Sequence, residues 1–169
     1  MKNFTLLRLF FFLAALGLAG CSGFPVASKS GLLDQLDTVI RQAAPDRPVS
    51  LTLTSTQVKT GDVIQAQVVT KTEGYLYLFQ VDTNGRSLSL LFPNSMDGAN
   101  YIAADATLVL PRSQWRMAAR GPAGVGYLMA VLTDKPQDLI RLYTDTNVGK
   151  ITLTPPFGAT MVMFHETAP

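Results

Sequence analysis

The sequence has little of what enzymes and metalloproteins use for chemistry. Its 169 residues include one cysteine, Cys21, and one histidine, His165. Glutamate occurs only twice, at Glu73 and Glu166. A zinc site takes three or four His, Cys, Asp or Glu ligands, and a lone cysteine has no partner for a disulfide. The composition therefore predicts no metal site, no disulfide framework and no paired acid–base constellation.

The remaining catalytic patterns are also incomplete, so we predict a protein that is not an enzyme and needs no dissociable cofactor. A base at His165 would need a nucleophile and an orienting acid from elsewhere in the fold, and a surface or strand-end histidine is the simpler interpretation. The start of a calcium loop is present in Asp82, Asn84 and Gly85, but the later ligands are missing. No glycine-rich phosphate loop with its following helix and lysine is present.

The first twenty residues have the layout of a secretory signal peptide. Lys2 and Arg8 precede an apolar run over 9–18, which is too short to span a bilayer permanently. The run ends in Leu18-Ala19-Gly20-Cys21, which resembles the lipobox of bacterial lipoproteins. The resemblance implies cleavage before Cys21, diacylglycerol on its sulfur and an acyl chain on the new amino terminus. The alternative is an ordinary signal peptide with a chance cysteine or a buried thiol.

Three regions follow from the change in pattern along the chain. We assign 1–20 to the signal peptide, 21–48 to a lipidated tether with a short amphipathic helix over 31–44, and 49–169 to a β domain. Removing the leader leaves 149 residues with twelve basic and twelve acidic side chains, enough for one core and without the basic surplus of a nucleic-acid-binding protein.

From residue 49 the apolar period changes to two, which is typical of strands. In the run 74–82, Tyr75, Tyr77 and Phe79 share one face while Leu76 and Leu78 share the other, so a central strand is expected. The strands that we predict cover 49–53, 64–68, 74–82, 87–92, 107–110, 127–133, 150–154 and 160–165. So many short strands with frequent turns predict a mainly β, antiparallel, immunoglobulin-like sandwich with two short helices.

Two connections carry specific predictions. Asn84-Gly85 lies between two strand-like runs and predicts a tight hairpin turn, because both residues accept positive φ. The second helix is expected to start at Asp134 as its N-cap, with Pro136 in the first turn. Its buried side is predicted to consist of Leu139, Ile140 and Tyr143.

One connection between strands, 112–124, is the best candidate for a binding surface. Trp115 lies there among Arg112, Arg116 and Arg120, and both residue types are favoured at interface hot spots. A short helix would place the three arginines, four residues apart, on one face. The rival interpretation is structural, with Trp115 closing one end of the sandwich. The other aromatic residues are expected mainly in the core; they are Tyr75, Tyr77, Phe79, Phe92 and Tyr127.

A series of short motifs resembles a known family. In order along the chain they are Gly61-Asp62-Val63-Ile64, Gly74-Tyr75-Leu76-Tyr77-Leu78, Asp82 with Gly85, Leu91-Phe92-Pro93-Asn94, Asn100-Tyr101-Ile102, Leu110-Pro111, and Gly124 before the strand at Tyr127. Their order and spacing are similar to those of the domain-of-unknown-function family DUF4384, over about residues 61–136. The resemblance implies an immunoglobulin-like sandwich found in envelope lipoproteins and appended to unrelated enzymes, and it supplies no catalytic residues.

These observations favour a lipid-anchored binding or scaffold module that holds another envelope or secretion-system protein. Ser22 after the lipidated cysteine favours the outer membrane, with the domain facing the periplasm. A small-ligand or glycan binder is the second hypothesis, and a cavity lined by Tyr75, Tyr77 and Trp115 would favour it. A flat patch around Trp115 would favour a protein partner, and polar groups converging on His165 in a cleft would favour a hydrolase.

Overall fold

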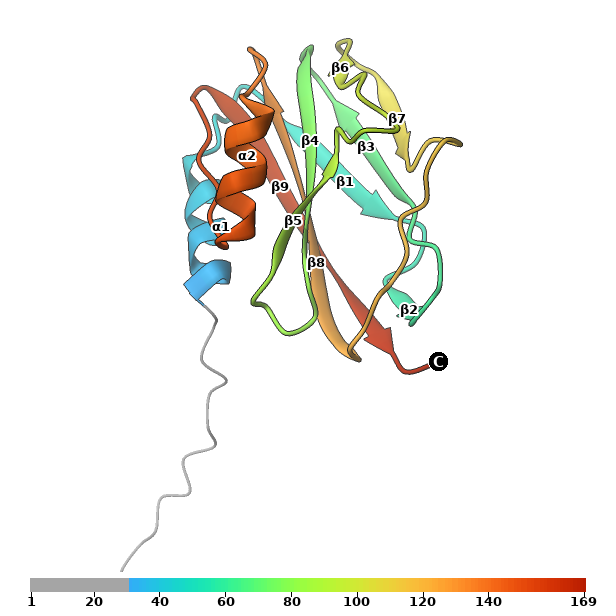
Figure 1. Cartoon of the computed structure of the whole chain (residues 1–169). Coiled ribbons are helices and arrows are strands. Elements are labelled where there is room, and N and C mark those ends of the chain that lie inside the picture. The colour runs from blue at the N-terminus through green and yellow to red at the C-terminus, as the bar shows by residue number, and fades with distance from the viewer. Residues whose placement is uncertain (1–30) are drawn as a thin grey trace, which may run out of the picture.

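The computed structural model describes residues 31–169, which form two sheets and two helices (Figure 1). Cys21 and the leader lie outside the described residues. Within those residues the elements are α1 (Gly31–Gln42), β1 (Val49–Leu53), β2 (Gln57–Lys59), β3 (Ala66–Thr70), β4 (Gly74–Val81), β5 (Leu88–Phe92), β6 (Tyr101–Ile102), β7 (Thr107–Leu110), β8 (Gly124–Thr133), α2 (Leu139–Asn147) and β9 (Phe157–Thr167). The prediction of a mainly β fold with two short helices is confirmed.

The two sheets differ in size. The smaller has the order β1-β3-β7, and the larger has the order β2-β9-β8-β4-β5 with β6 paired to β4. Most pairs are antiparallel, but β2 runs parallel to β9. The expectation of wholly antiparallel pairing is therefore wrong at this pair, because the long chain between β2 and β9 imposes no hairpin direction on them. The immunoglobulin-like assignment stays a prediction.

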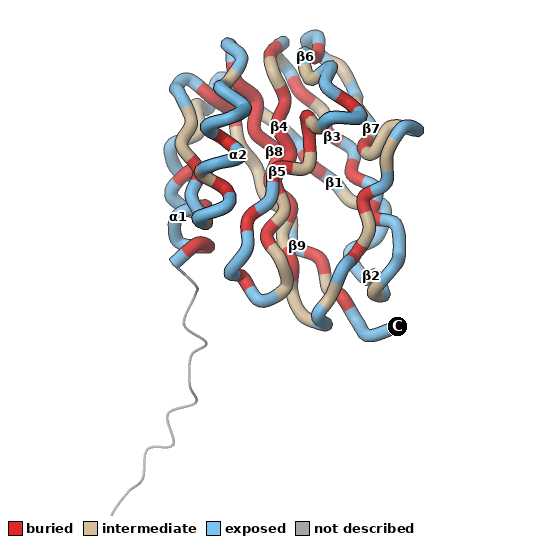
Figure 2. Tube along the Cα trace, in the orientation of Figure 1, coloured by how far each residue is buried: buried red, intermediate tan, exposed pale blue. Residues whose placement is uncertain are grey.

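The sheets face each other across an apolar core. The smaller sheet contributes Leu51 and Val68, and the larger contributes Leu78, Leu128 and Phe164. In Figure 2 the continuous buried stretches follow β4 and β8, the two strands at the centre of the larger sheet. The predicted central strand over 74–82 is thus confirmed, since its leucine face is packed between the sheets.

The other face of the larger sheet is covered by both helices (Figure 1). In α1, Leu36 and Val39 are buried and pack with Tyr77 and Phe79 of β4. The predicted helix over 31–44 is confirmed, although it ends at Gln42. The molecule therefore has three layers: the small sheet, the large sheet and the helices.

The second helix starts later than the sequence indicated. Its N-cap is Asp138, whose Oδ1 accepts a hydrogen bond from the Arg141 backbone N–H at 3.1 Å. Asp134 is therefore not the cap. Leu142 and Thr146 form the buried side of α2, four residues apart on one helical face. The predicted buried side is wrong at three positions, which are the exposed Leu139, Ile140 and Tyr143.

The hairpin between β4 and β5 is confirmed, but its turn is longer than two residues. The Asp82 N–H donates to the Ser87 carbonyl at 3.1 Å and closes a loop over 83–86. Gly85 has φ +70°, whereas Asn84 does not have positive φ. The Asn84 carboxamide oxygen instead accepts from the Arg86 N–H at 2.9 Å. A strand was also predicted over 150–154, and the structure has none there: the Thr154 N–H bonds to the Gln137 side chain instead of to a neighbouring strand.

Within residues 31–169, no helix has both the length and the apolar character that crossing a membrane requires.

Candidate functional site

The smaller sheet covers only part of the larger one, and the uncovered part is polar. Along the inner face of β4, Leu76 and Leu78 are fully buried between the sheets, and the next residue on that face, Gln80, is only half-buried. On β5 the corresponding residue is the exposed Ser89. Because side chains alternate along a strand, these polar residues lie on the same face as the leucines and mark where the apolar core ends.

An extended segment, 115–121, runs opposite this polar surface. The Met117 carbonyl accepts from the Ile64 N–H at 2.9 Å, and the Ala119 carbonyl accepts from the Gly61 N–H at 2.9 Å. The side chains of Met117 and Ala119 are buried in the core between the sheets. This strand-like pairing holds the segment in the layer of the smaller sheet. No helix forms over 112–123, so the three arginines do not share a helical face.

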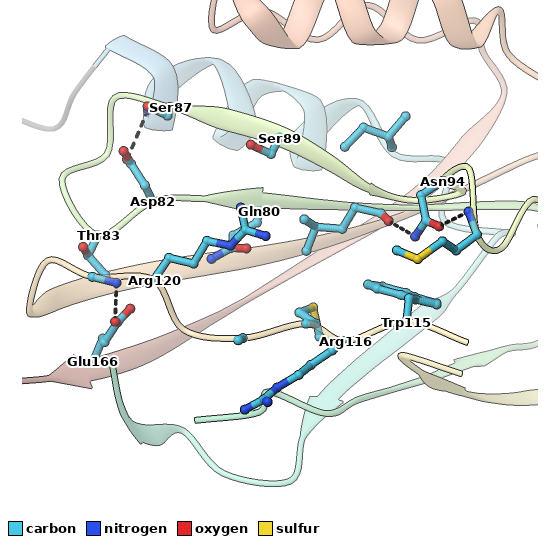
Figure 3. A pocket seen from close by; sticks show the side chains of 16 residues that line it. Gln80, Asp82, Thr83, Ser87, Ser89, Asn94, Trp115, Arg116, Arg120 and Glu166 are labelled. Atoms are coloured by element: carbon cyan, nitrogen blue, oxygen red, sulfur yellow. Dashed lines mark hydrogen bonds between the residues drawn. The ribbon is translucent and has the colours of Figure 1, made fainter. Parts of the chain in front are cut away.

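A cavity of about 370 Å³ lies between this polar surface and the segment 115–121 (Figure 3). We call this cavity the arginine groove. Its walls come from β4 and β5, from the loop after β5, from the segment 115–121 and from β9. The residues that the argument below uses are Gln80, Ser89, Trp115, Arg116, Ala118 and Arg120. Three of the four residues predicted for binding therefore share one cavity.

The fourth, Arg112, lies behind the groove in a cluster with Trp115. Both side chains bind Asp97, which is only 3% exposed. The Arg112 Nη1 lies 2.6 Å from Asp97 Oδ1, and the Trp115 Nε1 donates to Asp97 Oδ2 at 3.0 Å. The Arg112 guanidinium also sits over the Phe92 ring, 5.4 Å from its centroid. Arg112 is thus engaged within the fold, while Trp115 packs partly on the core and partly lines the groove.

Arg116 and Arg120 are the exposed cations of the groove. The Arg116 Nη2 donates to the Gly61 carbonyl at 2.9 Å. Arg120 extends from the segment toward Gln80 on the opposite wall (Figure 3). Guanidinium groups recognise carboxylates and phosphates through directed hydrogen bonds, and Arg120 is the cation placed to offer such bonds across the groove.

Glu166 closes one end of the groove, and its role was missed from the sequence. It is 3% exposed, accepts from Thr60 Oγ1 at 2.8 Å and also accepts from the Gly121 backbone N–H. These contacts tie β9 to the end of the arginine-bearing segment. Thr60 and Glu166 are far apart in the sequence and share no motif, so their contact becomes visible only in the folded structure.

The other candidate residues lie elsewhere. Tyr75 and Tyr77 point to the face beneath the helices, so they do not share a cavity with Trp115. His165 is half-buried on β9 and does not line the arginine groove. In the part of the chain that the structure describes, no three His, Cys, Asp or Glu side chains gather as metal ligands. Cys21 is outside that part.

Comparison with known proteins gives one result. No significant match was found among curated proteins or among solved structures. Residues 57–136 match the model of a family described as "Domain of unknown function (DUF4384)". The match runs from β2 to the residues before α2 and includes both groove arginines, although Glu166 and β9 lie beyond it. The resemblance found in the sequence motifs is therefore confirmed by the match to the DUF4384 family model over residues 57–136.

Proposed function

We propose that this protein is a non-enzymatic binding module, anchored by lipid on Cys21, that holds another protein of the bacterial envelope in the arginine groove. The observation that carries the proposal is the groove itself, where two exposed arginines and one tryptophan edge meet a polar surface left uncovered between the sheets. Loops and irregular segments on a rigid scaffold commonly carry recognition.

The anchor rests on the lipobox-like Leu18-Ala19-Gly20-Cys21. Stable membrane attachment takes more than one acyl chain, and a diacylglycerol with an N-acyl chain meets that requirement. Ser22 supports sorting to the outer membrane, with the domain in the periplasm. There the immunoglobulin-like sandwich would act as a scaffold for a component of a secretion or surface-assembly system.

A small-ligand or glycan binder is the alternative, and one observation favours it. The groove combines the Trp115 ring with uncharged polar side chains at Gln80, Ser89 and Asn94. Aromatic faces with a few placed polar groups are common in small-molecule sites. Loss of binding on Arg120→Gln favours an acidic protein partner, whereas a glycan held by Trp115 and Gln80 should tolerate that change.

Anchoring is tested by Cys21→Ala in cells. We expect the variant to leave the membrane fraction and to retain its leader or to be cut elsewhere. Cys21→Ser is the matched control for side-chain size and should behave as Cys21→Ala does. Normal processing and unchanged membrane fractionation in both variants would refute lipidation.

Binding through the groove is tested with a photocrosslinking residue at Ser89, in the otherwise unchanged full chain. Crosslinked products are expected at Ser89, and they should disappear when Arg120 is changed to Glu. The same probe at Thr52, which is exposed on β1, is the control. Products that are equal at both positions, or that survive Arg120→Glu, would contradict the proposed site.

A further inference from the structure

The arginine groove contains an unused backbone edge. Val63 and Ala118 form an isolated antiparallel bridge. The hydrogen bonds around it come from the flanking residues, because Ile64 N–H donates to the Met117 carbonyl and Ala119 N–H donates to the Asp62 carbonyl. In such a non-hydrogen-bonded pair, the N–H and C=O of the two central residues point away from each other. The backbone N–H and C=O of Ala118 therefore point away from Val63.

This edge borders the groove. Ala118 is one of the residues that line it, and the smaller-sheet layer ends at this segment. Across the cavity lie Gln80 and Ser89 on the inner face of the larger sheet (Figure 3). A further strand laid beside Ala118 would continue the smaller-sheet layer and cover these two polar side chains.

The charges beside this edge favour one class of strand. Arg116 and Arg120 flank Ala118 at a spacing of two, and both are exposed. The acidic side chains of the groove are already engaged. Asp82 Oδ1 accepts from the backbone N–H groups of the β4–β5 turn, and Glu166 is held by Thr60 and Gly121. Arg116 also donates to the Gly61 carbonyl, so Arg120 is the charge left for an incoming side chain, and a carboxylate is its complement.

We propose that the groove binds an extended, acidic peptide segment of a partner protein, which adds as a strand to the Ala118 edge and pairs a carboxylate with Arg120. Main-chain hydrogen bonds supply affinity in this mode of recognition, and side-chain contacts supply specificity. The proposal rests on the proposed binding function and names the chemistry of its partner. It does not depend on the proposed membrane anchor.

The test uses the full chain to select from a displayed library of random ten-residue peptides. The enriched peptides should be rich in Asp and Glu and poor in proline. Their affinity should fall at least tenfold with Ala118→Pro, which removes the outward N–H and breaks no internal hydrogen bond. Ala118→Ser keeps the N–H and is the matched control. Arg120→Gln should cost a similar factor for acidic peptides and nothing for peptides whose carboxylates are replaced by amides.

A measurement on the peptide guards against misfolding of the proline variant. N-methylation of alternate peptide amides should abolish binding when it falls on the edge facing Ala118 and should be tolerated on the opposite edge. Failure to enrich any acidic peptide, or binding that survives both Ala118→Pro and every N-methylation, overturns the proposal. Binding of an arrayed glycan that Ala118→Pro leaves unchanged also overturns it. If the groove binds a partner other than an acidic strand, crosslinking at Ser89 would persist while the peptide test fails. Failure of the strand proposal is therefore distinguishable from failure of the proposed binding function.

Discussion

Side chains alternate between the two faces of β4, and the two faces differ in how far along the strand they are buried. On the face under the helices, Tyr77, Phe79 and Val81 are all buried, so the apolar character persists to the end of the strand. On the opposite face, Leu76 and Leu78 are buried, and Gln80 then borders the arginine groove. One face is covered over its full length and the other only as far as the smaller sheet extends.

The difference between the two faces shows that the side chains along one strand become polar where the layer packed against that face ends. A buried polar side chain without partners is costly, so glutamine fits at position 80 only because the layer above it is incomplete. Ser89 on β5 marks the same limit. An opening between sheets can therefore be located from the point where one face of a central strand turns polar while the other stays apolar.

The largest expected effect comes from emptying the covered face. Phe79→Ala should lower the free energy of unfolding by about 3–5 kcal/mol, because the phenyl ring is fully buried. Gln80→Ala, one residue along the same strand, should change it by less than about 0.5 kcal/mol. Chemical denaturation of both variants measures the contrast. Equal losses at the two positions would contradict the difference between the faces.

A smaller loss is expected at the wall of the groove. Asp97→Ala leaves the Trp115 indole N–H without its acceptor and the Arg112 guanidinium with the Ala99 carbonyl but no counter-charge, and it should cost about 2 kcal/mol. Asp97→Asn keeps an oxygen for Trp115 and should lose less. Since Trp115 is the only tryptophan, its fluorescence reports whether the groove wall shifts. An unchanged spectrum and unchanged stability in Asp97→Ala would show that this cluster does not support the wall.

The turn between β4 and β5 should not tolerate a β-branched residue at Gly85, which is buried. Gly85→Val is expected to cost about 1 kcal/mol or more, since a β-branched residue is disfavoured at positive φ. Gly85→Asn is the control, because asparagine visits this region more readily. Thermal denaturation compares the two, and equal melting temperatures would argue against the positive φ at this position.

The smallest effect on stability is expected at Arg120. Its side chain is exposed, so Arg120→Gln should change the free energy of unfolding by less than about 0.5 kcal/mol. The same variant should lose partners crosslinked through Ser89. A marked destabilisation would assign Arg120 a structural role like that of Arg112 and remove it from the binding surface.

The local sequence pattern was sufficient to predict those helices and strands whose two faces lie in different environments. The alternation in β4 and the helical spacing in α1 were predicted correctly because burial there follows a single period. The second helix was not predicted correctly, because its apolar residues are distributed around more than one face. Leu142 is the residue that packs, while Ile140 is 81% exposed.

The groove depends on contacts that the sequence does not display. The segment with Arg116 and Arg120 is extended because its backbone bonds to residues near Ile64, and three arginines spaced four residues apart give no sign of that pairing. The identity of the residues was enough to nominate Trp115, Arg116 and Arg120. Their arrangement required the pairing of distant segments, and so did the part played by Glu166.

The long pairing of β8 with β9 decides how short a fragment of this chain can be without exposing a sheet edge. All ten residues of β8 pair with β9, yet the family match ends at Pro136, before β9 begins, and starts after β1. A fragment cut at those limits would expose one complete edge of β8 and one of β3, and such edges template aggregation. The matched range and the folded unit of this chain therefore have different boundaries, and a fragment of this chain that keeps both edges paired must include β1 and β9.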